Sequence, residues 1–302
     1  MKVSVIVPIY GVEAYIGLCA QTLLSQTYPD IEFLFVNDGT PDRSMEILRD
    51  ILRQFPARQV KVLNLENRGQ ALARVAGLEE ASGDYVWFVD ADDWVEPDAV
   101  ERMVDKAQQT RADIVYFDFW KEWPGRRKLD RERPYTAASR DKYMRRLFRD
   151  GAYGYLWNKF IRKSLFKGLF FPRYNMHEDV VLVTQLLSKA KVLAQLSVPL
   201  VHYRRGNAGA ATKAPKLRRR GAMARNYLDM YEFYRNLPGP NLLDTVQDDL
   251  MLRAAWVGYT LDRSLFSERP YLKEKARHLH LMPFHRVLLV QQLLLKAWLH
   301  VQ

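Results

Sequence analysis

The chain has 302 residues, enough for one large domain or for a domain with a smaller appendage, and its 48% hydrophobic content can build a sizeable core. Its formal net charge of +11 suits an anionic partner such as a nucleotide diphosphate, an anionic lipid headgroup or nucleic acid. The single cysteine, Cys19, excludes an internal disulfide and a cysteine-based zinc site, and we expect it to be a small buried hydrophobe.

No targeting or membrane-spanning segment is evident. The first residues lead directly into the apolar run 3–7, and no run of about 18 apolar residues occurs. We therefore expect a cytoplasmic protein, with peripheral contact to the inner face of the cell membrane as a further option.

The first part of the chain alternates short apolar runs with amphipathic segments. The runs are nearly continuous rather than alternating, which favours strands buried on both faces by helices and hence an α/β domain with a mostly parallel sheet. Pro41 and Pro97 predict helix starts at Thr40-Pro41 and Glu96-Pro97, because proline suits the first helical position. The predicted strands are 3–7, 31–36, 60–65, 85–90 and 114–117, and apolar residues recur at helical spacing over 16–24, 45–55 and 100–107.

After Phe117 the pattern changes. Residues 121–133 are crowded with charge, contain Pro124-Gly125 and predict a surface loop. Helices are expected over 140–148 and from about Glu178, and from about Lys213 the pattern is helical to the end with basic residues in excess. We expect a domain over 1–212, in halves of about 1–118 and 119–212, followed by a C-terminal helical region over 213–302.

Acidic residues follow two of the predicted strands, at the edge where open α/β sheets collect ligands. Asp38 follows the strand 31–36, and Asp90-Ala91-Asp92-Asp93 closes the strand 85–90. Three carboxylates so close together repel one another unless a cation or ordered donors compensate, and Mg²⁺ or Mn²⁺ binds such oxygens while bridging to substrate phosphates. The motif predicts a metal and phosphate site; a solvated acidic turn that caps the next helix is the alternative.

Other residues in the first half fit a nucleotide pocket. Tyr10 follows the first strand, and a tyrosine and an aspartate can frame a nucleobase. Asn67-Arg68-Gly69 opens a helix whose first turn could face an anion, and Arg74 lies one turn further on. Taken singly, each is equally explained as a packed aromatic, a turn former or a solvated helix residue. Their order along the chain favours the pocket.

Together these motifs resemble glycosyltransferase family 2, the inverting sugar transferases of the GT-A fold, over residues 1 to about 118. The resemblance implies a Rossmann-like α/β fold in which Pro8, Tyr10, Asp38 and Arg74 line the nucleotide pocket. Val75 departs from the family, which usually has asparagine there. The matching segments are Val7-Pro8-Ile9-Tyr10, Leu24-Ser25-Gln26-Thr27-Tyr28, Asn37-Asp38-Gly39-Thr40, Asn67-Arg68-Gly69 with Ala73-Arg74, Gly83-Asp84-Tyr85 and Asp90-Ala91-Asp92-Asp93.

The same resemblance implies roles for the acidic residues. Asp90 and Asp92 would reach the ribose and the metal, with Asp93 as a further ligand. The family places its general base in a Glu-Asp pair before an apolar helix, which implies Asp179 as the base and Glu178 as a supporting or acceptor-binding residue. A carboxylate pair at a helix start also fits capping, which is the structural alternative.

Two further segments resemble the family. Trp157-Asn158-Lys159 lies ahead of the base, so Trp157 could stack on an acceptor sugar or pack in the core, and Lys159 could contact a phosphate or hydroxyl. The segment 201–209 resembles a loop that closes over the diphosphate, which implies that Arg204 faces that group. His202 is either a metal ligand or, as is commoner for a lone histidine in a strand, structural.

The resemblance implies an inverting, metal-dependent glycosyltransferase. It would move a sugar from a nucleotide-diphosphate donor, UDP-linked, to a saccharide or lipid-linked acceptor in surface polysaccharide synthesis, with Mn²⁺ or Mg²⁺ as cofactor. A catalytically silent nucleotide-sugar or glycan-binding module is the alternative, although it would be expected to lose the base.

Other classes of partner and enzyme fit less well. A nucleotidyltransferase or a dinucleotide oxidoreductase would need a glycine-rich loop after the first strand, which Pro8-Ile9-Tyr10-Gly11 is not. Nucleic-acid binding is not expected, because no basic stripe interleaved with aromatics is evident. The basic C-terminal helices could pack on the catalytic domain, form a homodimer or touch a membrane.

Overall fold

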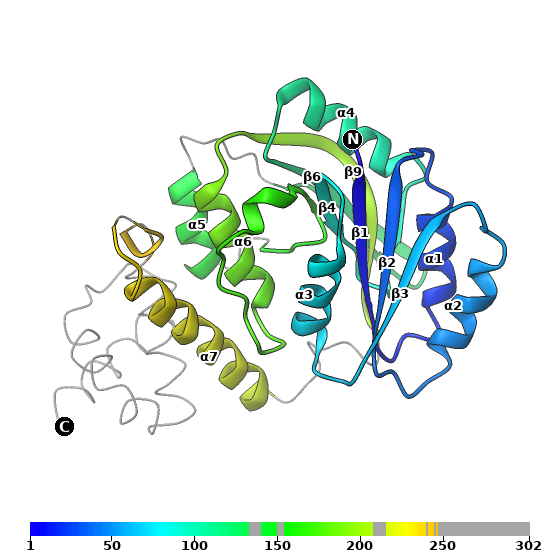
Figure 1. Ribbon diagram of the computed structural model, residues 1–302, viewed down its shortest axis with the longest axis horizontal. Coiled ribbons are helices and arrows are strands. Elements are labelled where there is room, and N and C mark those ends of the chain that lie inside the picture. The colour runs from blue at the N-terminus through cyan, green and yellow to red at the C-terminus, as the bar shows by residue number, and fades with distance from the viewer. Residues whose placement is uncertain (133–139, 150–153, 208–215, 240, 245, 247–302) are drawn as a thin grey trace.

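The protein is described by a computed structural model over residues 1–132, 140–149, 154–207, 216–239, 241–244 and 246. One mixed nine-stranded sheet organises these residues, in the order β3-β2-β1-β4-β8-β6-β9-β5 with β7 paired to β6. Its strands β3, β2 and β1 lie side by side in Figure 1. The strands are β1 Val3–Ile9, β2 Ile31–Asp38, β3 Gln59–Leu65, β4 Tyr85–Phe88, β5 Trp94–Val95, β6 Ile114–Trp123, β7 Arg126–Asp130, β8 Lys159–Arg162 and β9 Leu193–Arg204.

The parallel strands β3, β2, β1 and β4 form the first half of the sheet, as the sequence predicted. Helices cover both faces, because successive apolar residues point to opposite sides of each strand. Ile6, Leu34 and Phe88 pack on one face with α3, α5 and α6, while Val5 and Phe35 pack on the other face with α1, α2 and α4. These helices are α1 Ile16–Leu24, α2 Ser44–Leu52, α3 Gln70–Glu80, α4 Ala99–Thr110, α5 Arg140–Arg149 and α6 Glu178–Lys189.

The second half of the sheet brings the later part of the chain against β4. Strand β8 inserts antiparallel between β4 and β6, and β9 runs parallel to β6. The short strand β5 follows the Asp90–Asp93 turn and pairs with β9 at Trp94 and His202. The acidic turn is therefore anchored to β9 as well as to β4.

Helix α7 (Lys216–Arg235) packs into the same core as α5 and α6. Its Tyr227, Leu228 and Tyr231 are buried there with Val181 and Leu182 of α6. In the described part of the chain no helix is both long and apolar enough to cross a membrane. Most of the expected C-terminal helical region, 247–302, lies outside the described residues.

Three local predictions are wrong. The segment predicted as a surface loop contains a β6–β7 hairpin, which turns at Gly125 with a φ of +70°. Arg126 lies over the ring of Trp123 at 4.5 Å, and Arg127 lies over the ring of Trp120 at 4.6 Å. These cation–π contacts between β7 and β6 stabilise strands that are rich in charged residues. The helices expected at Pro41 and Pro97 begin at Ser44 and Ala99, and residues 201–204 belong to strand β9 rather than to a loop.

Candidate functional site

The acidic turn lies at the carboxyl end of β4. A backbone bond from the Asp93 N–H to the Asp90 carbonyl (3.0 Å) closes the turn. One carboxylate oxygen from each of Asp90, Asp92 and Asp93 lies within 4.8 Å of the others. Cys19 is fully buried beneath, as expected, with its thiol 3.8 Å from the Asp90 carbonyl oxygen.

Two carboxylates of this turn, Asp92 and Asp93, are short of compensating charge. Burial, followed by the neighbouring Asp90, raises the pKa of Asp92 to about 6, and burial with Asp92 raises the pKa of Asp93 well above its usual value. Within the described residues, Oδ2 of Asp93 is buried without a hydrogen-bond partner. These features fit a divalent cation, because hard cations take carboxylate oxygens and offset their repulsion.

The end of strand β9 and the residues directly after it supply donors to the turn. The Arg204 N–H donates to Oδ1 of Asp93 (2.7 Å), its Nε donates to the Asp92 carbonyl (2.9 Å), and Asn207 donates to Asp92 Oδ2. The Arg204 guanidinium lies between the rings of Tyr15 and Trp94, at 4.8 and 4.6 Å. Arg204 is thus beside the acidic turn, as its expected role at a diphosphate requires.

The raised pKa of Asp92 leads to a pH-dependent prediction. Between about pH 4 and pH 6 the folded protein keeps a proton that the unfolded chain has released, so this carboxyl lowers stability as pH rises. We expect metal-free Asp92→Asn to be more stable than wild type at about pH 7 and to lose most of the stabilisation by Mn²⁺. Thermal unfolding at several pH values, with EDTA or with Mn²⁺, measures both effects; equal Mn²⁺ responses in the two proteins would contradict the assignment.

Asp38 organises the start of α3. It is 2% exposed, its Oδ1 accepts from the Arg68 N–H (2.8 Å) and its Oδ2 accepts from the Gly69 N–H (2.9 Å). Tyr10, directly after β1, is 51% exposed at the same edge of the sheet, and Pro8 is half-buried within β1. Of the expected nucleotide-pocket residues, Tyr10 is therefore open to a ligand, whereas Asp38 holds the backbone of Arg68 and Gly69 at the start of α3.

Gly69 precedes α3 with a φ of +94°, a conformation that side chains rarely adopt. A Cβ at this position would lie 2.6 Å from Oδ1 of Asn175, the atom that accepts from the Ala71 N–H. We expect Gly69→Ala to destabilise the fold by about 1–3 kcal/mol, from backbone strain and displacement of Asn175. The free energy of unfolding in urea measures the change. Gly168→Ala is the control, because Gly168 also has a positive φ but an added Cβ there would meet nothing within 4 Å. Equal losses of stability in the two variants would show that the contact with Asn175 contributes nothing to the effect.

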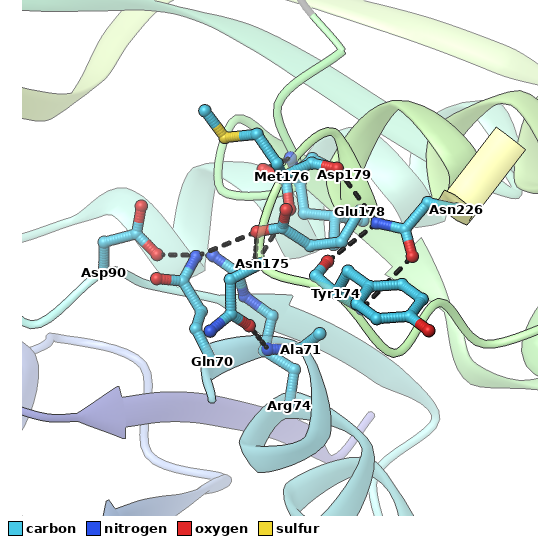
Figure 2. Close-up of polar contacts among 11 residues, drawn as sticks. Gln70, Ala71, Arg74, Asp90, Tyr174, Asn175, Met176, Glu178, Asp179 and Asn226 are labelled. Carbon is cyan, nitrogen blue, oxygen red and sulfur yellow. Dashed lines mark hydrogen bonds and ion pairs between the residues drawn. The ribbon is translucent and has the colours of Figure 1, made fainter. Parts of the chain in front are cut away.

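Arg74 joins the two acidic parts of the site (Figure 2). Its side chain is 2% exposed; Nη2 lies 2.7 Å from Asp90, and Nη1 lies 3.0 Å from Glu178 and 2.9 Å from Asp179. Burial opposes its charge, but Asp179, Asp90 and Glu178 outweigh this and raise its pKa. Arg74 was expected in the nucleotide pocket, and in the structure its guanidinium links the acidic turn to the Glu178–Asp179 pair.

Glu178 and Asp179 form the first turn of α6. Burial raises the pKa of both carboxyls, and Arg74 opposes that rise. Asp179 Oδ2 accepts from the Leu156 N–H (3.2 Å), and Glu178 Oε1 accepts from Gln70 (3.2 Å). The Glu178 carboxylate also accepts from its own backbone N–H in the first turn of α6, so the capping role left open by the sequence is met in part, while both carboxylates contact Arg74 in the site.

The two expected acceptor residues are buried. Trp157 is 2% exposed and stacks on Tyr155 and Tyr203, at centroid distances of 4.8 and 5.1 Å, which is the packing role left open by the sequence. Lys159 is fully buried, and its Nζ donates to the Tyr155 carbonyl and to Oδ1 of Asn158, both at 2.8 Å. Burial lowers the pKa of Lys159 to about 8, although Glu132 and Asp179 oppose the shift.

His202 has the structural role. Its Nδ1 lies 2.8 Å from Glu122 and its Nε2 lies 3.0 Å from Glu96, while its ring stacks on Trp94 at 4.9 Å. Both ring nitrogens are therefore engaged by carboxylates, and among the residues that the structure describes the group able to hold a metal consists of Asp90, Asp92 and Asp93.

Sequence reasoning missed Asn207 and Gln70. The side-chain amide of Asn207 donates to Asp92 and that of Gln70 donates to Glu178, and each pair is distant in the chain. Asn207 lies beside Gly206 in a segment already linked to the diphosphate, which was the available signal. Gln70 follows Gly69 at the start of α3 and carries no local pattern that separates it from a solvated helix residue.

Known glycosyltransferases resemble this chain in sequence. The family model for glycosyl transferase family 2 matches residues 4–170. The uncharacterized glycosyltransferase EpsJ of Bacillus subtilis is 34% identical over 221 residues, or 70% of this chain and 63% of EpsJ. The putative glycosyltransferase EpsH of the same organism is 32% identical over 67% of this chain and 60% of EpsH. The chain thus spans less than two thirds of each of these relatives.

Solved structures share the fold. S. aureus TarS 1-349 in complex with UDP-GlcNAc superposes with a TM-score of 0.66 at 20% identity, covering 91% of this chain and 78% of TarS 1-349. The mannosyltransferase PcManGT of Pyrobaculum calidifontis, in complex with GDP-Man and Mn²⁺, gives 0.56 at 17% identity, covering 99% and 86%. These matches confirm the expected GT-A fold, and with the family match over more than half of its length, the chain belongs to glycosyl transferase family 2.

Proposed function

We propose that the protein is an inverting, metal-dependent glycosyltransferase. The donor is a nucleotide-diphosphate sugar, UDP-linked, and the acceptor is a hydroxyl of a saccharide or lipid-linked molecule in surface polysaccharide synthesis. The observation that carries this proposal is the bridge through Arg74, whose guanidinium contacts both Asp90 of the acidic turn and Asp179.

The acidic turn is the proposed site of the cation and the leaving diphosphate. Asp90, Asp92 and Asp93 would hold Mn²⁺ or Mg²⁺, which when bound would offset negative charge on the departing phosphates. Arg204, held between two aromatic rings beside Asp92, would add positive charge at the same place. Tyr10 is the exposed aromatic available to a nucleobase.

Asp179 is the proposed general base. Each of its oxygens accepts one hydrogen bond, from Arg74 or from the Leu156 N–H, and a carboxylate oxygen can accept a second. Asp179 would take the proton of the acceptor hydroxyl while that oxygen bonds to the anomeric carbon and the bond to the diphosphate breaks. Attack on the face opposite the leaving group inverts the configuration.

Relatives and neighbours bear on the choice of donor and metal. TarS is seen with UDP-GlcNAc, and PcManGT with GDP-Man and Mn²⁺. We propose a UDP-sugar and Mn²⁺ as the first pair to test, with GDP-sugars and Mg²⁺ next. A reaction at the inner face of the cell membrane, from the cytoplasm, would suit the net charge of +11 and a lipid-linked acceptor.

Thermal unfolding with a panel of nucleotide sugars, each with and without Mn²⁺, tests the donor site. We expect one donor class to raise the unfolding temperature only when Mn²⁺ is present, and we expect Asp92→Asn to lose that response. The proposal would be overturned if no nucleoside diphosphate and no nucleotide sugar raised the unfolding temperature.

A further inference from the structure

The segment 174–177 leads directly into the Glu178–Asp179 pair and belongs to neither a helix nor a strand. It ends at His177, whose φ of +57° is unusual for a residue other than glycine. His177 is the N-cap residue of α6 and makes no side-chain capping bond. The direction in which α6 presents Asp179 therefore depends on what holds this segment in place.

Asn226 of α7 supplies hydrogen-bond partners for the segment (Figure 2). Its side chain is fully buried; Oδ1 accepts from the Tyr174 N–H (3.1 Å), and Nδ2 donates to the carbonyls of Tyr174 (2.7 Å) and Met176 (2.9 Å). One amide thus meets three backbone groups about 50 residues away in the chain. Buried backbone N–H and C=O groups need hydrogen-bond partners. Here the Asn226 side chain supplies partners to a segment that pairs with no strand among the described residues.

The next residue of α7 continues the same contact. The Tyr227 hydroxyl lies 2.5 Å from Nδ1 of His177, and the two rings meet edge to face at 5.8 Å. Tyr227 is fully buried in the core shared by α6 and α7. Two consecutive residues of α7 therefore contact the residues just before the acidic pair.

Helix α3 holds the segment from the other side. Asn175 accepts from the Ala71 N–H (3.2 Å), and Gln70 donates to Glu178 (3.2 Å). The segment is thus fixed between the start of α3, next to Asp38, and helix α7. Because α3 also carries Arg74, which reaches Asp90, any shift of this segment would change the position of Asp179 relative to the acidic turn.

We propose that Asn226 and Tyr227 are positioning residues for sugar transfer, so that α7 is part of the active-site architecture. This inference rests on the proposed function, in which Asp179 is the base. Asn226 would act through the backbone of residues 174 and 176, and Tyr227 would act through the side chain of His177. A displacement of about 1 Å at a reacting group can cost about 100-fold in rate, so these contacts control turnover more than donor affinity.

The test uses Asn226→Ala and Tyr227→Phe in the full chain, with two matched controls on or beside α7. Asn241→Ala removes an amide that donates to the Tyr234 and Gly239 carbonyls, and Tyr234→Phe removes a buried hydroxyl that donates to Gln185. The readouts are kcat and KM for Mn²⁺-dependent hydrolysis of the most active nucleotide sugar, and hydrogen exchange of the Tyr174 amide.

We expect Asn226→Ala to lower kcat by about 10- to 100-fold with KM within about twofold of wild type. Exchange at Tyr174 should rise in the same variant. Tyr227→Phe should lower kcat less, and both controls should keep wild-type kcat and exchange. The milder Tyr227→Phe keeps the test valid if Asn226→Ala does not fold.

Two results would overturn the inference and separate it from the proposed function. An active wild type whose kcat is unchanged by Asn226→Ala and Tyr227→Phe, or is lowered equally by Tyr234→Phe, would refute the positioning role and leave the proposed function standing. A wild type that turns over no nucleotide sugar would refute the proposed function, and with it this inference, whatever the exchange at Tyr174 shows.

Discussion

Replacing Asp179 by asparagine is expected to lower donor turnover by about 100- to 10,000-fold, the usual contribution of a general base. The amide keeps an oxygen that can accept from Arg74 or from the Leu156 N–H, so the fold should be retained. Donor affinity, measured by calorimetry with the nucleoside diphosphate and Mn²⁺, should stay within about twofold of wild type, because Asp179 acts on the acceptor.

Glu178→Gln is the matched control for this prediction. Glu178 is the neighbouring carboxylate, contacts the same Arg74 nitrogen and lies in the same first turn of α6. We expect it to lower turnover far less than Asp179→Asn. Wild-type turnover by Asp179→Asn, or a greater loss in Glu178→Gln, would remove Asp179 from the role of base.

Replacing Arg74 by methionine is expected to destabilise the protein by about 3–5 kcal/mol, because it leaves buried carboxylates without their cation. Arg74 is 2% exposed, and its three acidic partners come from β4's carboxyl end and from α6. Arg74→Lys should be intermediate, since an ammonium group lacks the planar fork that reaches several carboxylates at once. The free energy of unfolding in urea near neutral pH is the quantity to measure for wild type, Arg74→Met and Arg74→Lys.

The loss caused by Arg74→Met should shrink as pH falls. The pKa values of Glu178 and Asp179 are already raised by burial, so these carboxyls protonate before ordinary surface carboxyls and then need no counter-ion. Unfolding free energies of wild type and variant that differ by less than about 1 kcal/mol at neutral pH would contradict the bridging role of Arg74.

The first half of the fold was predictable because its signals are local. Continuous apolar strands separated by amphipathic helices indicate a parallel sheet, and four of these strands pair as expected. The β6–β7 hairpin was missed because its strands are charged; they are stabilised by arginines lying over Trp120 and Trp123, a contact that exists only after pairing. The prolines at 41 and 97 marked turns a few residues before the helices.

The site was predictable in its residue types but not in its pairings. The carboxylates at the strand ends were found because of their position, whereas the bond from Arg74 to Asp179 joins residues 105 apart in the sequence. Trp157 and Lys159 carry side chains typical of sugar and phosphate sites, yet both are buried, Trp157 just before β8 and Lys159 at its first residue. Burial of this kind depends on tertiary packing, which no local pattern reports.

The most direct test of the proposed transfer is the configuration of the sugar first released from a UDP-α-linked donor with water as acceptor. Proton NMR follows the anomeric signal before mutarotation. The proposed mechanism predicts that the β-anomer appears first, that its release needs Mn²⁺, and that Asp92→Asn and Asp179→Asn both strongly reduce its rate of release. Initial release of the α-anomer, or release that is independent of Mn²⁺, would contradict inverting, metal-dependent transfer at this site.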